Sequence, residues 1–142
     1  MSTLLLDAGV WLAARDADDR HHEPACRLIE AGPDARPLAA LDLTLYEVAN
    51  VATRSWRSPD RARIVARLVR AACTDTIAPV DDALIERAIA LADEHGLSVY
   101  DAAYVAAARE RAWTLVSTDH ADLVGPGHAI APEDAIAQEL DD

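Results

Sequence analysis

Four acidic residues stand where a predicted strand ends or a predicted helix begins. Asp7 follows the apolar run 3–6 and Asp119 follows the run 114–118, while Glu47 and Asp101 lie near the starts of predicted helices, three residues after Thr44 and Ser98. Crowded carboxylates repel one another, and an all-carboxylate ligand set suits a hard cation such as Mg²⁺ or Mn²⁺. A cation held in this way activates water against a phosphodiester. If the fold gathers the four acids, the pattern favours metal-assisted hydrolysis.

Each acid also has a purely structural explanation. The segment Thr44-x-x-Glu47 is typical of a capping box at a helix start, and Ser98-x-x-Asp101 resembles one with Asp in the place of Glu. Asp7 or Asp119 alone could simply begin a turn. Four acids at four separate strand or helix ends are harder to explain by capping alone, and this favours a shared site.

The composition predicts a folded chain whose overall charge is unusual for a protein that handles nucleic acid. Of its 142 residues 51% are apolar and none is Phe, so the core must consist of Leu, Val, Ile and Ala. A net charge of −12 opposes binding to phosphates, which therefore requires a local basic surface and a bound metal. Arg63, Arg67 and Arg70 recur at helical spacing and form a candidate RNA-binding strip, with a solvated helix face as the alternative.

Other residue types exclude several classes of protein. All 13 basic residues are Arg, and the lack of Lys excludes P-loop and Schiff-base enzymes. Cys26 and Cys73 lie far apart without metal-ligand spacing, which predicts two free thiols. The chain shows neither a basic leader nor an apolar run of membrane-spanning length, so we expect a cytoplasmic location and no membrane partner.

Short apolar runs alternate with helical patterns along the chain. Strands are predicted at 3–6, 38–41, 76–80 and 114–117, with an edge strand at 128–131, and helices at 10–14, 21–31, 42–56, 58–73, 81–95, 98–112 and 132–140. This order predicts an α/β fold in one domain, residues 1–142, with a core over 3–131 and a C-terminal helix. We expect a mostly parallel sheet of four to five strands with helices on both faces. Ligands bind such sheets at the carboxyl ends of the strands.

Four motifs, in order along the chain, resemble those of PIN-domain ribonucleases. They are Leu4-Leu5-Leu6-Asp7, Thr44-x-x-Glu47-x-x-Asn50, Ser98-x-x-Asp101-Ala102-Ala103-Tyr104 and Leu115-Val116-Ser117-Thr118-Asp119. Their spacing is similar to that of the VapC toxins of bacterial type II toxin–antitoxin pairs. The resemblance implies that Asp7, Glu47, Asp101 and Asp119 bind Mg²⁺ or Mn²⁺ and catalyse RNA cleavage, leaving a 5′-phosphate. It also implies supporting roles for Asn50 and Ser117.

Two positions depart from the pattern of that family. Gly9 stands where Ser or Asn is frequent, so one hydroxyl or amide contact is missing. A further acid often follows the fourth by two residues, whereas Asp122 follows Asp119 by three. We therefore place Asp122 among the supporting residues and not among the ligands.

The resemblance further implies macromolecular partners. These are an RNA substrate, a second copy of the chain in a homodimer, and a VapB-type antitoxin that forms a heterotetramer or larger assembly with it. Apolar positions that are candidates for such contacts are Val10, Trp11, Leu12, Leu45, Tyr46 and Val48. The alternative function is a catalytically silent PIN module that binds RNA or a protein without cutting.

Overall fold

The computed structural model describes residues 2–32 and 35–141, with side chains described as far as residue 138. In chain order the elements are β1 (Leu4–Leu6), α1 (Ala8–Ala13), α2 (His22–Glu30), β2 (Leu38–Leu41), α3 (Asp42–Arg54), α4 (Pro59–Ala72), β3 (Ile77–Ala78), α5 (Asp82–His95), α6 (Val99–Arg111), β4 (Thr114–Val116), the π-helical turn η1 (His120–Val124) and α7 (Pro132–Asp141). Each strand is followed by one or two helices, as the alternating pattern predicted.

The four strands form one parallel sheet in the order β3-β2-β1-β4. The chain first winds from β1 through β2 to β3, and then crosses back to place β4 on the other side of β1. The order therefore reverses between β1 and β4, where Leu5 pairs with Leu115. In parallel α/β sheets a reversal of this kind opens a crevice at the carboxyl ends of the two strands.

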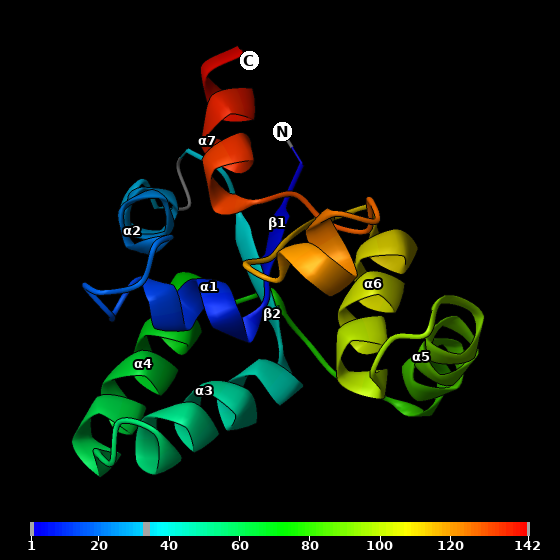
Figure 1. Cartoon of the computed structure of the whole chain (residues 1–142), viewed down its shortest axis with the longest axis horizontal. Coiled ribbons are helices and arrows are strands. Elements are labelled where there is room, and N and C mark those ends of the chain that lie inside the picture. Colours follow the sequence, from blue (N-terminus) through cyan, green and yellow to red (C-terminus); the bar gives the residue numbers. More distant parts are fainter. Residues whose placement is uncertain (1, 33–34, 142) are drawn as a thin grey trace.

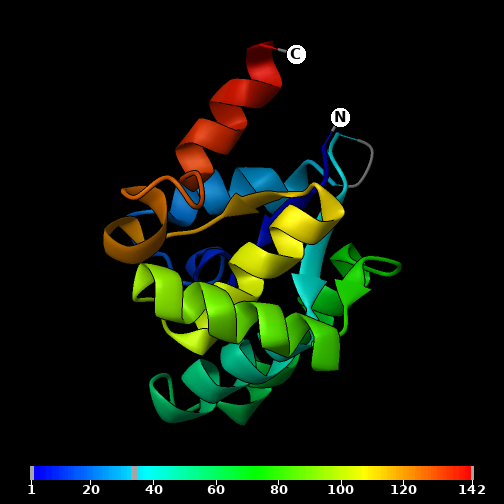
Figure 2. The same cartoon turned by 90° about the vertical axis from the view of Figure 1, so that its right-hand side faces the viewer.

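Both faces of the sheet are buried, which explains why the strands read as continuous apolar runs. Leu4 and Leu6 face a core built with α1, α2, α4 and α7, whereas Leu5 faces a second core built with α5, α6 and η1. Figures 1 and 2 show the sheet between these two layers of helices. Small residues of α6, such as Ala103 and Ala107, are buried and allow close packing. The predicted α/β class with helices on both faces is confirmed.

Several predicted helix ends are confirmed by their caps. The Ser58 hydroxyl accepts a hydrogen bond from Arg61 N, the Asp81 carboxylate from Leu84 N and the Ser98 hydroxyl from Asp101 N. Gly96, at φ 69°, ends α5 in the left-handed conformation that glycine adopts without strain. Side-chain capping therefore determines where α4, α5 and α6 begin.

The predicted edge strand at 128–131 is wrong as a strand. Only Ile130 pairs with the sheet, through a single parallel bridge to Val116. Helix α7 begins at Pro132, whose nitrogen carries no hydrogen for a ladder, so the pairing cannot extend further. The sheet therefore has four strands over the described residues.

Two other predictions concern the chain as a whole. Cys26 and Cys73 are both free thiols, as predicted. Among the described residues, no helix combines the length and apolar character needed to cross a bilayer.

Candidate metal centre

The reversal point of the sheet places three predicted site residues side by side. Asp7 directly follows β1, and Ser117 directly follows β4. The Ser117 hydroxyl donates a hydrogen bond to Asp7 Oδ2, and Ser117 Oγ accepts one from Asp119 N at 3.0 Å. Ser117 is fully buried, so this bond ties the ends of the two strands together away from solvent. The predicted supporting position of Ser117 is thus a direct contact with Asp7.

Asp7 combines burial with negative neighbours. It is the N-cap of α1, and its Oδ1 accepts a hydrogen bond from Val10 N at 3.2 Å. Burial raises the pKa of Asp7 to about 7, against the opposing effect of its two hydrogen bonds, and the negative charges of Glu47 and Asp101 add to the rise. A carboxylate in this environment gains stability from any bound cation.

Glu47 is positioned by a relay of hydrogen bonds and does not serve as a cap. Leu41 is the N-cap of α3, so the interpretation of Thr44-x-x-Glu47 as the capping box of this helix is wrong. Thr44 is the third helical residue, and its hydroxyl oxygen accepts a hydrogen bond from Leu41 N at 3.1 Å. Thr44 and Tyr104 share a hydrogen bond of 2.7 Å, and the Tyr104 hydroxyl donates to Glu47 Oε1 at 2.7 Å.

This relay has two consequences for Glu47. Because Glu47 lies in the second turn of α3, its carboxylate is not used by the backbone of the first turn, and the capping explanation for it fails. Burial raises the pKa of Glu47, and the nearby charge of Asp101 raises it further, although the Tyr104 hydroxyl stabilises the ionised form. Only one of its oxygens is engaged by Tyr104, which leaves the other for a ligand.

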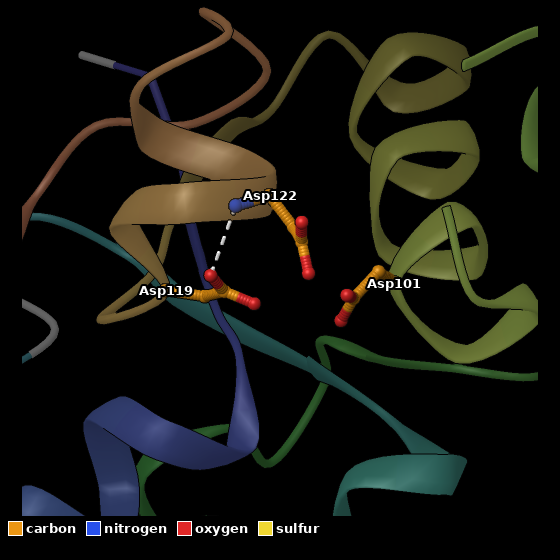
Figure 3. A group of neighbouring side chains, drawn as sticks. All are labelled: Asp101, Asp119 and Asp122. Carbon is orange, nitrogen blue, oxygen red and sulfur yellow. Dashed lines mark hydrogen bonds between the residues drawn. The ribbon is translucent and has the colours of Figure 1, made fainter. Parts of the chain in front are cut away.

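Three further carboxylates meet between α6 and η1. Each of Asp101, Asp119 and Asp122 contributes one carboxylate oxygen to a group whose atoms all lie within 4.8 Å of one another. Figure 3 shows Asp101 pointing from α6 toward the other two, which come from the first turn of η1. Asp119 Oδ1 accepts a hydrogen bond from Asp122 N at 3.0 Å, and this contact fixes the turn. The structure therefore brings Asp122 beside two of the predicted ligands.

Electrostatic coupling joins these carboxylates into one region. Burial raises the pKa of Asp101, and the charges of Asp119 and Asp122 raise it further. The charge of Asp101 in turn raises the pKa values of Asp7 and Glu47, so Asp101 couples these two carboxylates to Asp119 and Asp122. The set offers only oxygen donors, which fits a hard divalent cation and not a soft one.

The remaining predicted site residues lie outside this group. Asn50 is exposed one turn beyond Glu47, on the wall of a surface groove. Arg63, Arg67 and Arg70 are exposed on α4, and Arg63 forms an ion pair with Asp60 at 3.1 Å. The ion pair is compatible with the alternative of a solvated helix face.

Most of the apolar positions that were candidates for partner contacts are not on the surface. Val10, Trp11 and Val48 are fully buried in the core, and Leu12 and Leu45 pack against it. Tyr46 is the exception, with 78% of its surface exposed. The helical pattern of α1 and α3 correctly indicated apolar faces, but these faces cover the sheet.

Two surface depressions flank the carboxylates. A groove of about 700 Å³ contains Glu47 and Asn50 in its wall. A smaller cavity of about 330 Å³ borders Ser117 and Thr118 and includes the basic side chain of Arg20. A chain molecule bound at the centre thus has one depression beside Glu47 and another beside Ser117 and Thr118.

Two pairs of residues important for the site were missed by sequence reasoning. The first is Thr44 with Tyr104, which positions Glu47; the need of a buried tyrosine hydroxyl for a partner was the available signal. The second is Gly9 with Thr118. A Cβ on Gly9 would lie 2.3 Å from Thr118 Oγ1 and 3.4 Å from Asp7 Oδ1. Gly9 therefore permits the loop after β4 to approach the start of α1, and no sequence pattern indicated this.

The Gly9–Thr118 contact yields a stability prediction. Alanine normally stabilises a helix relative to glycine by up to about 1 kcal/mol. Here the added methyl must displace Thr118, so we expect Gly9→Ala to lower the free energy of unfolding by roughly 1–3 kcal/mol. Thr118→Ala removes the nearest atom and should restore most of this loss in the double variant. Urea unfolding of the four proteins tests the contact, and a single Gly9→Ala variant that is stabilised would contradict it.

Comparisons with known proteins agree with this architecture. The family model for the PIN domain matches residues 4–123. Similar solved structures include a toxin–antitoxin complex from Klebsiella pneumoniae, with 23% identity, coverage of 91% of this chain and 97% of that chain, and a TM-score of 0.65. The protein PAE2754 from Pyrobaculum aerophilum has 23% identity, coverage of 99% and 98%, and a TM-score of 0.68.

A third similar structure is VapC20 of Mycobacterium tuberculosis, described as a sarcin–ricin loop cleaving toxin. It shares 24% identity, with coverage of 87% of this chain and 95% of that chain, and a TM-score of 0.68. No curated protein matches the chain by sequence. At these identities the structural likeness shows a common fold.

Proposed function

Because this chain belongs to the PIN-domain family, we propose that it is a metal-dependent ribonuclease that acts as the toxin of a VapBC-type toxin–antitoxin pair. The observation that carries the proposal is electrostatic: the charges of Glu47 and Asp101 raise the pKa of Asp7, the charge of Asp101 raises the pKa of Glu47, and the charge of Asp119 raises the pKa of Asp101. Such crowding destabilises a protein that has no cation to bind, and a binding module would gain nothing from it.

The ligand set that we propose comprises the four acids predicted from the sequence, and we add Asp122 to it. Asp101, Asp119 and Asp122 provide three oxygens within reach of a single ion. Asp7 and Glu47 supply further oxygens on the side of the sheet. Mg²⁺ or Mn²⁺ is the ion that fits these donors, and one or two ions are compatible with five carboxylates.

The catalytic roles follow from how each side chain is held. A divalent cation, when bound, supplies a more acidic water and stabilises charge on the phosphate oxygens. Ser117 and the Val10 N–H hold the two oxygens of Asp7 in fixed directions. Tyr104 holds Glu47 in the same way. Asp7 and Asp101 are the candidates for orienting the attacking water and accepting its proton, because their pKa values are raised above those of surface carboxylates.

We further propose that the protein works in the cytoplasm as a homodimer and is silenced by a VapB-type antitoxin in a heterotetramer or larger assembly. The fold that it shares with a toxin–antitoxin complex supports this proposal. An antitoxin segment that carries a cationic side chain would complement the five carboxylates. Copurification of the chain with the product of a neighbouring gene, followed by loss of activity in the complex, tests the partnership.

The enzymatic proposal is tested by incubating the purified protein with structured RNA and Mg²⁺. We expect discrete cleavage products with 5′-phosphate and 3′-hydroxyl ends, no cleavage in EDTA, and recovery when Mg²⁺ or Mn²⁺ is returned. RNA that is bound but never cut, at any concentration of either metal, would support the catalytically silent module instead. Cleavage that persists in EDTA would contradict the metal mechanism.

The phosphate-binding surface remains a proposal that rests on Arg63, Arg67 and Arg70 of α4. Charge reversal at Arg63 and Arg67 is expected to weaken RNA binding and to reduce its dependence on salt, because fewer counterions are then released. Arg20, in the cavity beside Thr118, provides the comparison. If Arg20→Glu lowers the affinity and the α4 variants do not, the α4 strip is a solvated helix face.

A further inference from the structure

Most of the aromatic rings of this chain are already occupied. There are three Trp and three Tyr and no Phe. Trp11 and Tyr104 are buried. The faces of Trp56 and Trp113 are each covered by an arginine guanidinium, at 3.9 Å and 5.1 Å from the ring centroid. These four rings serve the core or a cation–π contact.

The two remaining rings are exposed and stand beside the carboxylate centre. Tyr46 is 78% exposed and Tyr100 is 62% exposed. Tyr46 directly precedes Glu47 on α3, and Tyr100 directly precedes Asp101 on α6. Both rings line the groove of about 700 Å³ that also contains Glu47. Free aromatic faces are thus placed next to the position of the phosphodiester to be cut.

The rest of the groove suits a flat ligand with polar edges. Leu43 and Ala49 contribute apolar surface, and Asn50 and Thr53 contribute polar groups. The Thr53 hydroxyl donates to Ala49 O at 2.8 Å, so its oxygen can still accept a hydrogen bond. The Asn50 amide both donates and accepts. An unpaired nucleobase has the same combination of an apolar face and a hydrogen-bonding edge.

We propose that Tyr46 and Tyr100 form a stacking site for unpaired nucleobases adjacent to the scissile phosphate. The inference rests on the proposed ribonuclease function and adds to it the residues that hold the substrate bases. RNA is favoured over a protein segment because the groove is continuous with the carboxylates through Glu47. A phosphate held at those carboxylates carries its own bases directly into the groove.

The test compares two short RNAs of equal length and charge, one with unpaired bases and one with abasic riboses. Fluorescence anisotropy measures their binding to the wild-type protein with Ca²⁺ in place of Mg²⁺, and gel electrophoresis of the recovered RNA verifies that no cleavage has occurred. We expect Tyr46→Ala and Tyr100→Ala each to weaken binding of the base-bearing RNA by roughly 5- to 100-fold. Binding of the abasic RNA should not change. Tyr46→Phe and Tyr100→Phe, which keep the ring, should bind both RNAs as the parent does.

A matched control separates stacking from a general loss of exposed apolar surface. Ile89 on α5 is 49% exposed and does not line the groove, so Ile89→Ala should leave both affinities unchanged. Light scattering reports the oligomeric state of every variant. The inference is overturned if the alanine variants lose equal affinity for the two RNAs. It is also overturned if the affinity falls only in variants whose oligomeric state has changed, because the rings then contact a protein surface.

Unchanged affinity in both alanine variants would overturn it as well. The cleavage assay of the wild-type protein distinguishes this outcome from failure of the proposed ribonuclease function. If the wild type cuts RNA and the tyrosine variants bind RNA as the wild type does, only the proposed stacking site is refuted. If the wild type never cuts RNA but the tyrosine variants still show weaker base-dependent binding, only the proposed ribonuclease activity is refuted.

Discussion

Replacing Asp7 by Asn is expected to lower RNA cleavage by about a thousand-fold or more while the fold is retained. The amide has nearly the same shape as the carboxylate, and it can still accept a hydrogen bond from Val10 N. The amide lacks the negative charge that attracts a cation. It is also far less basic than the carboxylate, so it cannot accept a proton from the attacking water. A thousand-fold loss corresponds to about 4 kcal/mol of transition-state stabilisation. Single-turnover cleavage at saturating Mg²⁺ measures this effect.

The matched control for this prediction is Asp75→Asn, which removes one charge from an exposed aspartate. Because it changes the net charge equally, it should cleave RNA as wild type does. Circular dichroism and urea unfolding must show that Asp7→Asn is folded, since a loss of activity through unfolding says nothing about the site. A folded Asp7→Asn variant with wild-type turnover would refute the assignment of Asp7.

The metal-free protein is expected to lose stability as the pH rises from about 4 to about 7. Burial raises the pKa of Asp7 in the folded state to about 7, against an ordinary value of 3.8. Between these pH values the folded protein holds a proton that the unfolded chain has released, so stability falls with increasing pH. A shift of about three units corresponds to a loss on the order of 4 kcal/mol. The raised pKa values of Glu47 and Asp101 act in the same direction.

Urea unfolding in EDTA over this pH range measures the effect, and Asp7→Asn isolates it. The difference in stability between wild type and Asp7→Asn should grow steadily from pH 4 to pH 7, because the amide does not titrate. Addition of Mg²⁺ at pH 7.5 should then stabilise wild type by about 3 kcal/mol at a hundred times its dissociation constant. A constant difference between the two proteins across the range would show that Asp7 is not the titrating group.

The elements of this fold could be predicted because their signals are local. Ser58, Asp81 and Ser98 begin helices through short-range hydrogen bonds, and the predicted helices 58–73, 81–95 and 98–112 start at these residues. The strands were visible as continuous apolar runs because the sheet is buried on both faces. Segment 128–131 has the same apolar character, but a single paired residue does not make a strand.

The candidate site was predicted only where one rule for parallel sheets applied. The rule is that ligands bind at the carboxyl ends of parallel strands, and it predicted that Asp7 and Asp119 lie at the same edge of the sheet. It could not reveal that Thr44 stabilises Glu47 through Tyr104, because this relay joins α3 to α6 across a long stretch of sequence. The approach of Asp122 to Asp101 depends on the π-helical geometry of η1, which carries no distinct sequence signal.

Gly9 is the clearest case of information absent from the sequence. In the sequence, Gly9 indicates only that a polar contact is missing. The structure shows that the space is filled by Thr118 Oγ1, from a loop more than a hundred residues away. Only the three-dimensional approach of the two segments explains why a glycine fits at this position.

The claim on which the whole account depends is that these carboxylates share a divalent cation. The most direct measurement is anomalous diffraction from crystals of the protein soaked with Mn²⁺. The account predicts a strong anomalous peak among Asp7, Asp101 and Asp119 that disappears in crystals of Asp7→Asn. Saturating Mn²⁺ that leaves this region empty, or that appears only elsewhere on the surface, would contradict it.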